Sequence, residues 1–248
     1  MLLPKTSDAV HKAWLYTVLT EIADHRDLSR LLRFKGGTCA AMLGWINRFS
    51  VDLDFDLIDE RQVAFVQKEL EKIFKKLSLE IKDKSQKAPQ YFLKYPAALK
   101  DRNTLKLDVS FPPVKANDYE PYRFEEIDRI FHCQTPSTMF ANKLVALMDR
   151  YEKTGSIAGR DLFDIHTFFT KGFTYKPEVI EERRGVEAKI YLKELKKFIQ
   201  EEITQTVIDQ DLNTLVPPVD FKKLRLILKP QVLIFLGANE FKMDSEES

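Results

Sequence analysis

The sequence predicts an α+β protein built from two domains. Period-two alternation of apolar residues, which is typical of β-strands, is concentrated in the first half of the chain. Beyond about residue 125 the apolar spacing is mostly helical. We therefore expect an α/β domain over residues 1–125 and a mainly helical domain over residues 126–248, with a cleft between them. A chain of 248 residues is long enough for each domain to have its own core.

The expected elements follow from local patterns, taken in chain order. The first domain should contain a helix over about 8–31, a short strand, a helix over 38–45, a strand from Asp52, a helix over 60–77, and strands near 78–82, 89–95 and 104–111. Pro112 and Pro113 should end the last strand, because proline cannot continue a hydrogen-bonded ladder. In the second domain we expect a charged amphipathic helix near 178–203 and a disordered tail over 244–248.

Composition excludes several classes of protein. Hydrophobic residues make up 44% of the chain and charged residues 31%, an ordinary balance for a soluble globular protein. The formal charge is only +1, so any contact with nucleic acid must come from a local patch. The sequence has no signal-peptide pattern and no apolar run long enough to cross a membrane. We therefore expect a cytoplasmic protein without a membrane partner.

The most informative stretch is a glycine turn followed by alternating aspartates. Lys35-Gly36-Gly37-Thr38 can approach a triphosphate closely, because glycine has no Cβ. A dozen residues later Asp52, Asp54 and Asp56 alternate with apolar residues, so a strand would place all three on one face. Carboxylate oxygens are suitable ligands for Mg²⁺, which would also remove the repulsion between the three charges.

Two other known motifs do not fit this stretch, and one structural alternative does. A calcium-binding EF-hand loop starting at Asp52 would need Gly at position 57 and Glu at position 63, and the chain has Leu57 and Val63 there. A Walker A loop needs its lysine after the glycines, whereas Lys35 precedes them. A strand with a solvated acidic face remains open, although aspartate is a poor strand former.

A fourth carboxylate lies on a later predicted strand. Leu105, Leu107, Val109 and Phe111 alternate on one face, which leaves Lys106, Asp108 and Ser110 on the other. An aspartate in the middle of an apolar strand needs a partner. That partner is either a metal ion or a basic residue such as Lys106.

These motifs together resemble the DNA-polymerase-β-like nucleotidyltransferase superfamily, most closely its AbiEii-type toxin branch. The resemblance rests on Gly-Gly-Thr, Arg-x-Ser-x-Asp-Leu-Asp-Phe, Ala-x-Lys-Leu-x-Ala-Leu and Arg-Asp-x-x-Asp, which here span residues 34–166. It implies a mixed sheet with flanking helices followed by the helical domain. It also implies that Asp52 and Asp54 bind the metal, that Asp108 is the third carboxylate, and that Asp56 is an additional candidate ligand.

The third motif places a lysine among apolar residues of a helix that starts at Thr135 and Pro136. Lys143 either extends to solvent or faces an anion, and Arg150 follows two turns later. The resemblance favours a grip on the β- and γ-phosphates of a nucleotide. Two departures from the family are Asn142, where an acidic residue is expected, and Thr38 in place of serine.

The fourth motif opens another predicted helix. Asp161 and Asp164 lie three residues apart and share a face, which equally suits acids at a helix N-terminus. The resemblance implies that these acids, with Arg160, organise the site by holding Lys143 or Arg150. The histidines His11, His25, His132 and His166 show no metal-ligand spacing, and Cys39 and Cys133 form no zinc motif, so we predict no zinc site.

One further segment has a mixed basic and aromatic composition. It contains Lys82, Lys84, Lys87, Lys94, Lys100 and Arg102 with Tyr91, Phe92 and Tyr95. Such a mixture suits a nucleic-acid backbone and unstacked bases. An ordinary hairpin whose aromatic side chains belong to the core is the favoured alternative.

The sequence thus predicts a nucleotidyltransferase that uses Mg²⁺ or Mn²⁺ and a nucleoside triphosphate. The predicted catalytic residues are Asp52, Asp54, Asp108, Lys143 and Asp161; the predicted nucleotide contacts are Lys35, Gly36, Gly37, Thr38, Arg48, Ser50, Lys143 and Arg150. The resemblance implies a bacterial toxin that modifies the 3′ end of tRNA and has a cognate antitoxin. The alternatives are an enzyme that modifies a small molecule such as an antibiotic, an inactive nucleotide-binding protein, and a metal-dependent phosphohydrolase.

Overall fold

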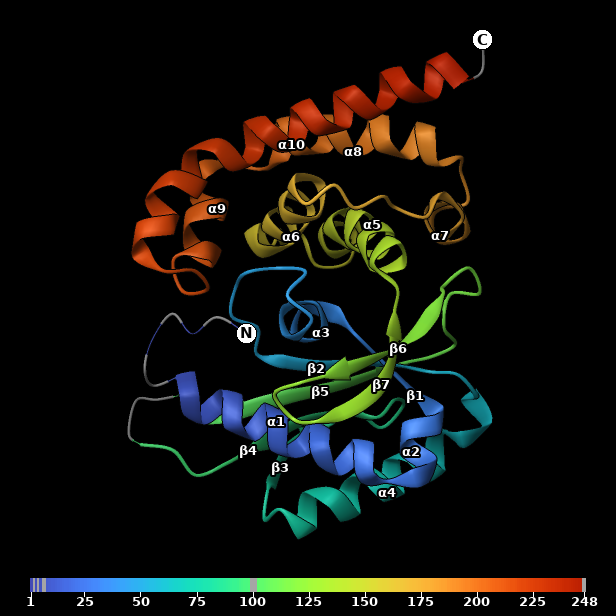
Figure 1. The fold of residues 1–248 in the computed structure, drawn as a ribbon, viewed down its shortest axis with the longest axis vertical. Helices are drawn as coiled ribbons and strands as arrows, with labels where there is room; N and C mark the ends of the chain where they lie inside the picture. The colour runs from blue at the N-terminus through green and yellow to red at the C-terminus, as the bar shows by residue number, and fades with distance from the viewer. Residues whose placement is uncertain (2, 4, 6–7, 99–101, 247–248) are drawn as a thin grey trace. The chain divides into compact units, whose positions relative to one another are not determined.

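The structure is a computed structural model that describes residues 1, 3, 5, 8–98 and 102–246. The chain divides into two compact units (Figure 1). The first comprises residues 1–44, 48–113 and 118–135, and the second comprises residues 45–47, 114–117 and 136–248.

The first unit is built on a seven-stranded mixed sheet. Its strands are β1 (Leu32–Lys35), β2 (Asp52–Leu57), β3 (Glu80–Lys84), β4 (Gln90–Lys94), β5 (Thr104–Ser110), β6 (Tyr119–Phe124) and β7 (Arg129–Gln134), in the order β3-β4-β5-β2-β1-β7-β6. β2 pairs in parallel with β5 and antiparallel with β1. The sheet therefore places the aspartate strand at its centre.

Helices cover both faces of this sheet. They are α1 (Asp8–Asp24), α2 (Arg26–Leu31), α3 (Gly36–Met42) and α4 (Val63–Lys76), with a 3₁₀ turn at Glu60–Gln62 before α4. Figure 1 shows α1 and α4 on one face and α3 on the other. Leu53 and Phe55 of β2 are fully buried. Phe55 packs on Phe34 of β1, with ring centroids 5.2 Å apart, so the apolar face of β2 fixes its register.

The second unit is helical. It contains α5 (Pro136–Thr154), α6 (Gly159–Thr170), α7 (Pro177–Arg184), α8 (Ala188–Glu202), α9 (Gln205–Leu212) and α10 (Pro218–Glu246). Phe140 of α5 stacks on Phe168 of α6 at 5.1 Å between centroids, which locates its core. No helix in the described part of the chain is both long enough and apolar enough to span a membrane.

Several predicted elements differ from the observed ones. The helix expected over 8–31 is interrupted at His25, whose imidazole accepts a hydrogen bond from Leu28 N and caps α2. The helix expected over 178–203 is two helices, because Gly185 ends α7 in the left-handed conformation at φ +70°. Helix α3 begins at Gly36 rather than at residue 38.

The largest difference lies around the expected domain boundary. The sequence predicts mostly helical structure beyond about residue 125, and α5 to α10 confirm it, but the helices start only after β7, which occupies Arg129–Gln134 and pairs with β6 in a hairpin. At the other end of the chain, α10 extends to Glu246. The prediction of a disordered tail over 244–248 is therefore wrong for residues 244–246. Residues 247 and 248 lie outside the described residues.

Candidate active site

The predicted carboxylates meet at the centre of the sheet. The parallel register of β2 and β5 places Asp54 beside Asp108, Asp52 beside Lys106 and Asp56 beside Ser110. Paired residues share a face of a sheet. The structure therefore brings Asp52, Asp54 and Asp108 onto one face, as the alternation predicts.

The electrostatics of this face centre on Asp54. Burial, and then the negative charge of Asp52, raise the pKa of Asp54 to about 6, and Asp108 adds to the effect. The ammonium groups of Lys35 and Lys106 act in the opposite direction without cancelling it. The ionised form of Asp54 is therefore held at a cost that a nearby cation would offset.

Asp108 is held by two polar neighbours. Lys106 Nζ lies 2.5 Å from Asp108 Oδ2, and Gln90 Nε2 donates to the same oxygen over 2.9 Å. Asp108 keeps about a quarter of its side chain exposed. Of the two partners that the sequence allows for Asp108, a metal ion or a basic residue, the pairing with Lys106 is thus present in the structure.

Asp56 has a different environment from the other two aspartates of β2. It is almost fully buried, and it accepts hydrogen bonds from Lys35 Nζ at 2.6 Å, Tyr119 Oη at 2.9 Å and Gln134 Nε2 at 2.8 Å. Three donors occupy its oxygens, which argues against its use as a metal ligand. Asp56 is better described as the acceptor that holds Lys35.

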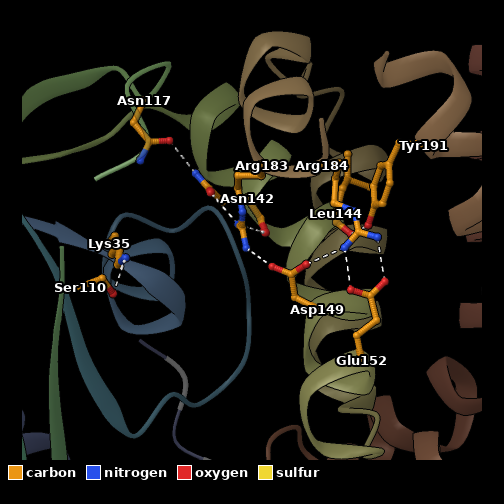
Figure 2. Close-up of polar contacts among 10 residues, drawn as sticks. All are labelled: Lys35, Ser110, Asn117, Asn142, Leu144, Asp149, Glu152, Arg183, Arg184 and Tyr191. Atoms are coloured by element: carbon orange, nitrogen blue, oxygen red, sulfur yellow. Dashed lines mark hydrogen bonds and ion pairs between the residues drawn. The ribbon is translucent and has the colours of Figure 1, made fainter. Parts of the chain in front are cut away.

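The glycine turn is fitted closely around the carboxylates. Gly36 has φ +78°, and a Cβ there would lie 2.4 Å from Asp54 Oδ2. Lys35, immediately before it, donates from Nζ to Asp56 and, over 3.1 Å, to Ser110 Oγ (Figure 2). The turn therefore brings bare backbone and an ammonium group beside Asp54.

The other predicted nucleotide contacts of this unit are buried within the protein. Thr38 is fully buried, and its hydroxyl donates to the Asp52 carbonyl over 2.5 Å. Arg48 is only 3% exposed, and a Cβ on Gly37 would lie 2.8 Å from both Arg48 Nη2 and Ser50 Oγ. These three side chains therefore contact the protein itself, and among the predicted nucleotide contacts of this unit the glycine backbone and Lys35 are the ones that lie beside Asp54.

The second unit assembles the later motifs into one charged cluster. Lys143 Nζ of α5 lies 2.8 Å from Asp164 Oδ2 and 3.4 Å from Asp161 Oδ1 of α6. Arg150 Nε lies 3.2 Å from the other oxygen of Asp161. Asp161 and Asp164 are both buried, whereas Arg150 keeps over a third of its side chain exposed. The cluster contains two acids and two bases, and Arg150 is its exposed member.

The remaining predicted residue of this motif, Arg160, lies in the first turn of α6 and is partly exposed. His166 is buried and bonds through Nε2 to Gln231 Oε1 at 2.6 Å, which is a packing role. Both cysteines are buried free thiols, and burial raises the pKa of Cys39 well above its usual value. A thiolate nucleophile is therefore disfavoured.

A second network, which the sequence did not indicate, fixes α5 against α7. Arg183 donates to Asp149 and to the Asn142 side chain, while Arg184 donates to Asp149 and Glu152 (Figure 2). Asn142 also donates to Asn117 Oδ1 over 2.9 Å. The departure from the family at Asn142 thus has a local reason, since an amide both accepts from Arg183 and donates to Asn117.

The carboxylate set suits Mg²⁺ bound together with a nucleotide. Within the described residues, no three His, Cys, Asp or Glu side chains are grouped to hold a metal ion by themselves. Mg²⁺ commonly takes only one or two protein carboxylates and completes its shell with substrate phosphates and water. Asp52 and Asp54, on one face of β2 and beside the glycine turn, fit that mode of binding.

Comparison with known proteins identifies the family to which the chain belongs. The family model of AbiEii nucleotidyl transferase toxins of type IV toxin–antitoxin systems matches residues 17–226. The chain therefore belongs to this family and is a nucleotidyltransferase of the toxin class. None of the curated protein sequences matches the chain.

Solved structures share the fold. JHP933 from Helicobacter pylori matches with a TM-score of 0.57 and 19% identity, covering 99% of this chain and 100% of that chain. MenT4, a nucleotidyltransferase toxin from Mycobacterium tuberculosis H37Rv, matches with a TM-score of 0.54 and 17% identity, covering 96% and 88%. At these identities the likeness concerns the fold alone.

Proposed function

We propose that this toxin transfers a nucleoside monophosphate from a nucleoside triphosphate to an acceptor hydroxyl, with release of pyrophosphate. The proposed acceptor is RNA, specifically the 3′ end of tRNA, and a cognate antitoxin is the proposed partner. The observation that best supports this reaction is the position of Asp54, which lies near both Asp52 and Asp108 and beside a glycine turn. Three carboxylates next to bare backbone suit a metal-bound triphosphate better than they suit a structural role.

The residues of the first unit divide the work. Asp52 and Asp54 would hold the metal, and the Gly36–Gly37 turn with Lys35 would contact the phosphates. Mg²⁺ or Mn²⁺, when bound, would neutralise charge on the triphosphate and on the reacting oxygens. Asp108 would accept the proton of the acceptor hydroxyl as that oxygen attacks the α-phosphate in line.

The cluster of the second unit is proposed to act on the leaving pyrophosphate. Arg150 is exposed enough to contact a phosphate, and its Nε bond to Asp161 would orient the guanidinium. Lys143 is held by two buried acids, so its charge is already balanced within the protein. We therefore assign the phosphate contact first to Arg150, and to Lys143 with Asp161 and Asp164 the task of positioning it.

The experiment is to incubate the protein with total tRNA, Mg²⁺ and each of the four α-labelled nucleoside triphosphates, with the Asp54→Ala variant alongside. We expect label in RNA with the wild type and a loss of about a thousandfold or more in the variant, since metal stabilisation of the transition state is worth several kcal/mol. Circular dichroism should show the variant folded. Transfer retained by Asp54→Ala would remove the metal role of Asp54.

A binding measurement separates the metal from the reaction. Mg²⁺ with a triphosphate should raise the melting temperature of the wild type, because a ligand that binds only the folded state stabilises it. The Asp54→Ala variant should show little of this shift. Absence of label with all four nucleotides, combined with a normal shift, would favour a small-molecule acceptor or an inactive binding protein.

A further inference from the structure

The sheet face that carries the carboxylates continues beyond Asp108 onto β4. The antiparallel register pairs Gln90 with Asp108 and Phe92 with Lys106. The hydrogen bond from Gln90 Nε2 to Asp108 Oδ2 shows that Gln90 lies on the carboxylate face. Phe92, two residues further along the same strand, therefore lies on that face as well.

Phe92 differs from the other aromatic residues of this segment. Tyr91 and Tyr95 are 1% and 2% exposed and belong to the core, as expected for an ordinary hairpin with aromatic core residues. Phe92, in contrast, is 36% exposed. Lys100, a basic residue of the same segment, lies outside the described residues. The exposed ring thus remains as the one aromatic surface of β4 that a ligand could cover.

The charges around Phe92 are arranged asymmetrically. Lys106 lies opposite it on β5 and reaches Asp108, and Lys94 follows it on the same face of β4. The edge strand β3 places acids on the other side, with Asp83 opposite Phe92 and Glu80 in a 3.4 Å ion pair with Lys94. A phosphate beside Phe92 would therefore be attracted by Lys106 on β5 and repelled by Asp83 at the sheet edge.

We propose that this strip of Phe92 and Lys106 receives the terminal nucleotide of a single-stranded RNA acceptor. The base would stack on the Phe92 ring, the adjoining phosphate would pair with Lys106, and the ribose hydroxyl would reach Asp108. An aromatic ring accepts every base, because every base has a π-face. The inference rests on the proposed function and deepens it by naming the residues that bind the end of the acceptor.

The strip adjoins the carboxylate site both through neighbouring residues and in distance. Phe92 and Asp108 are joined through Lys106 and Gln90, each of which neighbours both residues in the register or along a strand. Two residues along a strand span about 7 Å, so the ring lies within one nucleotide of the carboxylate. A base that stacks on Phe92 would therefore hold the chain end at the reacting group.

The test measures RNA binding directly and does not depend on turnover. A short fluorescein-labelled single-stranded RNA with a free 3′ hydroxyl is titrated with the full chain, and binding is followed by anisotropy. Phe92→Leu keeps an apolar side chain but removes the ring, and Phe92→Trp keeps an aromatic surface. Ile130→Ser serves as the matched control, because Ile130 is an exposed apolar residue on β7, at the far side of the sheet.

Stacking on an aromatic side chain implies about a tenfold loss of RNA affinity for Phe92→Leu. Phe92→Trp and Ile130→Ser should bind as the wild type does, and the concentration of triphosphate needed for the Mg²⁺-dependent melting shift should stay the same in all four proteins. Equal RNA affinity of the wild type and Phe92→Leu would overturn the inference. A loss confined to triphosphate binding would also overturn it, because the ring would then contact the nucleotide donor.

The two proposals fail in different ways. If the wild type transfers label to tRNA and Phe92→Leu does so with an unchanged KM for tRNA, the inference is wrong and the proposed function stands. If the wild type transfers no label while Phe92→Leu still weakens RNA binding, the RNA-binding strip stands and the proposed reaction is wrong.

Discussion

Neighbouring aspartates on one strand have different surroundings. Asp56 is buried with three hydrogen-bond donors, whereas burial, and then the like charge of Asp52, raise the pKa of Asp54 to about 6. Donors stabilise the carboxylate of Asp56 and complete its hydrogen bonding. Burial and repulsion together make the negative charge of Asp54 unfavourable, and a bound cation would offset that cost.

Gly36 is required by this arrangement for two separable reasons. Its φ of +78° is unfavourable for any residue with a Cβ, and that Cβ would also collide with Asp54 Oδ2. Gly44 has a similar φ of +72° but no atom within 4 Å of the corresponding position. Gly44 therefore provides a control for backbone strain alone.

We predict that Gly44→Ala costs about 1–2 kcal/mol of stability, the usual cost of the left-handed conformation for a residue with a Cβ. Gly36→Ala should cost more, and it should also abolish the stabilisation by Mg²⁺ and triphosphate because Asp54 must move. Urea unfolding with and without the ligands measures both quantities. Equal losses in the two variants, with ligand stabilisation intact, would show that Asp54 does not depend on Gly36.

At this scale the sequence predicts which carboxylates share a face of the sheet better than it predicts which side chains hold each of them. Alternation alone places Asp52, Asp54 and Asp108 on one face, because a strand has a fixed period of two. Asp56 follows the same alternation, and nothing local distinguishes it. Its partners Tyr119 and Gln134 are more than 60 residues away in the sequence and come from the β6–β7 hairpin, which was not predicted.

Among the elements, helix α5 has an unusually specific attachment to its neighbour. Arg183 and Arg184 of α7 share Asp149, and Arg184 also lies over the Tyr191 ring at 5.1 Å. Tyr191 in turn donates to the Leu144 carbonyl over 3.0 Å (Figure 2). These contacts involve residues of α5 that lie next to Lys143 and Arg150 in the sequence, so they hold this part of the helix in a fixed orientation and position along its axis.

We predict that Arg183→Ala destabilises the protein by about 1.5–3 kcal/mol, because it removes charge-assisted hydrogen bonds from the partly buried Asp149. Arg123→Ala is the matched control: its ion pair with Asp128 is largely exposed, and solvent screening should leave stability unchanged. Thermal unfolding of both variants measures the loss of stability, and we expect a lower melting temperature for Arg183→Ala than for Arg123→Ala. Similar melting temperatures for the two would reduce the α5–α7 network to an ordinary surface contact.

The sequence patterns missed the hairpin and the helix breaks for two different physical reasons. The β6–β7 hairpin lies at one end of the sheet, and much of β6 is exposed, so no clear alternation of apolar residues marks it. The breaks at His25 and Gly185 depend on a side-chain cap and on a left-handed residue, each set by a single position. Periodicity averages over such positions, and it therefore merged α1 with α2 and α7 with α8.

In the whole molecule, the chain passes between the two units several times rather than once. Residues 45–47 and 114–117 belong to the helical unit, although the segments on both sides of each belong to the sheet unit. The first of these segments lies between α3 and β2, and the second lies between β5 and β6. A linear division of the sequence cannot represent such an arrangement, since these short segments carry no compositional signal of their own.

His11 joins distant parts of the sheet unit and makes its stability depend on pH. The ring is fully buried; Nε2 lies 2.8 Å from the Val51 carbonyl and Nδ1 lies 2.6 Å from Tyr95 Oη. Burial, with a smaller contribution from Arg102, lowers the pKa of His11 to about 4. The neutral ring therefore connects α1 to the segment before the aspartate strand and to Tyr95, the residue that follows β4.

The direction of the effect follows from the two pKa values. Between pH 4 and 6.5 the unfolded chain binds a proton at His11 and the folded protein does not, so the free energy of unfolding rises with pH in this window. The contribution is complete above pH 6.5 and is lost as the pH falls to 4. At about 1.4 kcal/mol per pH unit it amounts to at most about 3–4 kcal/mol.

We predict that His11→Gln, which removes this titration, gives a flatter dependence of stability on pH than the wild type across this window. Urea unfolding of both proteins at several pH values measures the difference between the two slopes. That difference is independent of any constant loss that the substitution causes, because a constant loss shifts the whole curve equally. Parallel curves for the two proteins would mean that His11 takes up a proton without leaving its buried position, and that this ring does not link the stability of the sheet unit to pH.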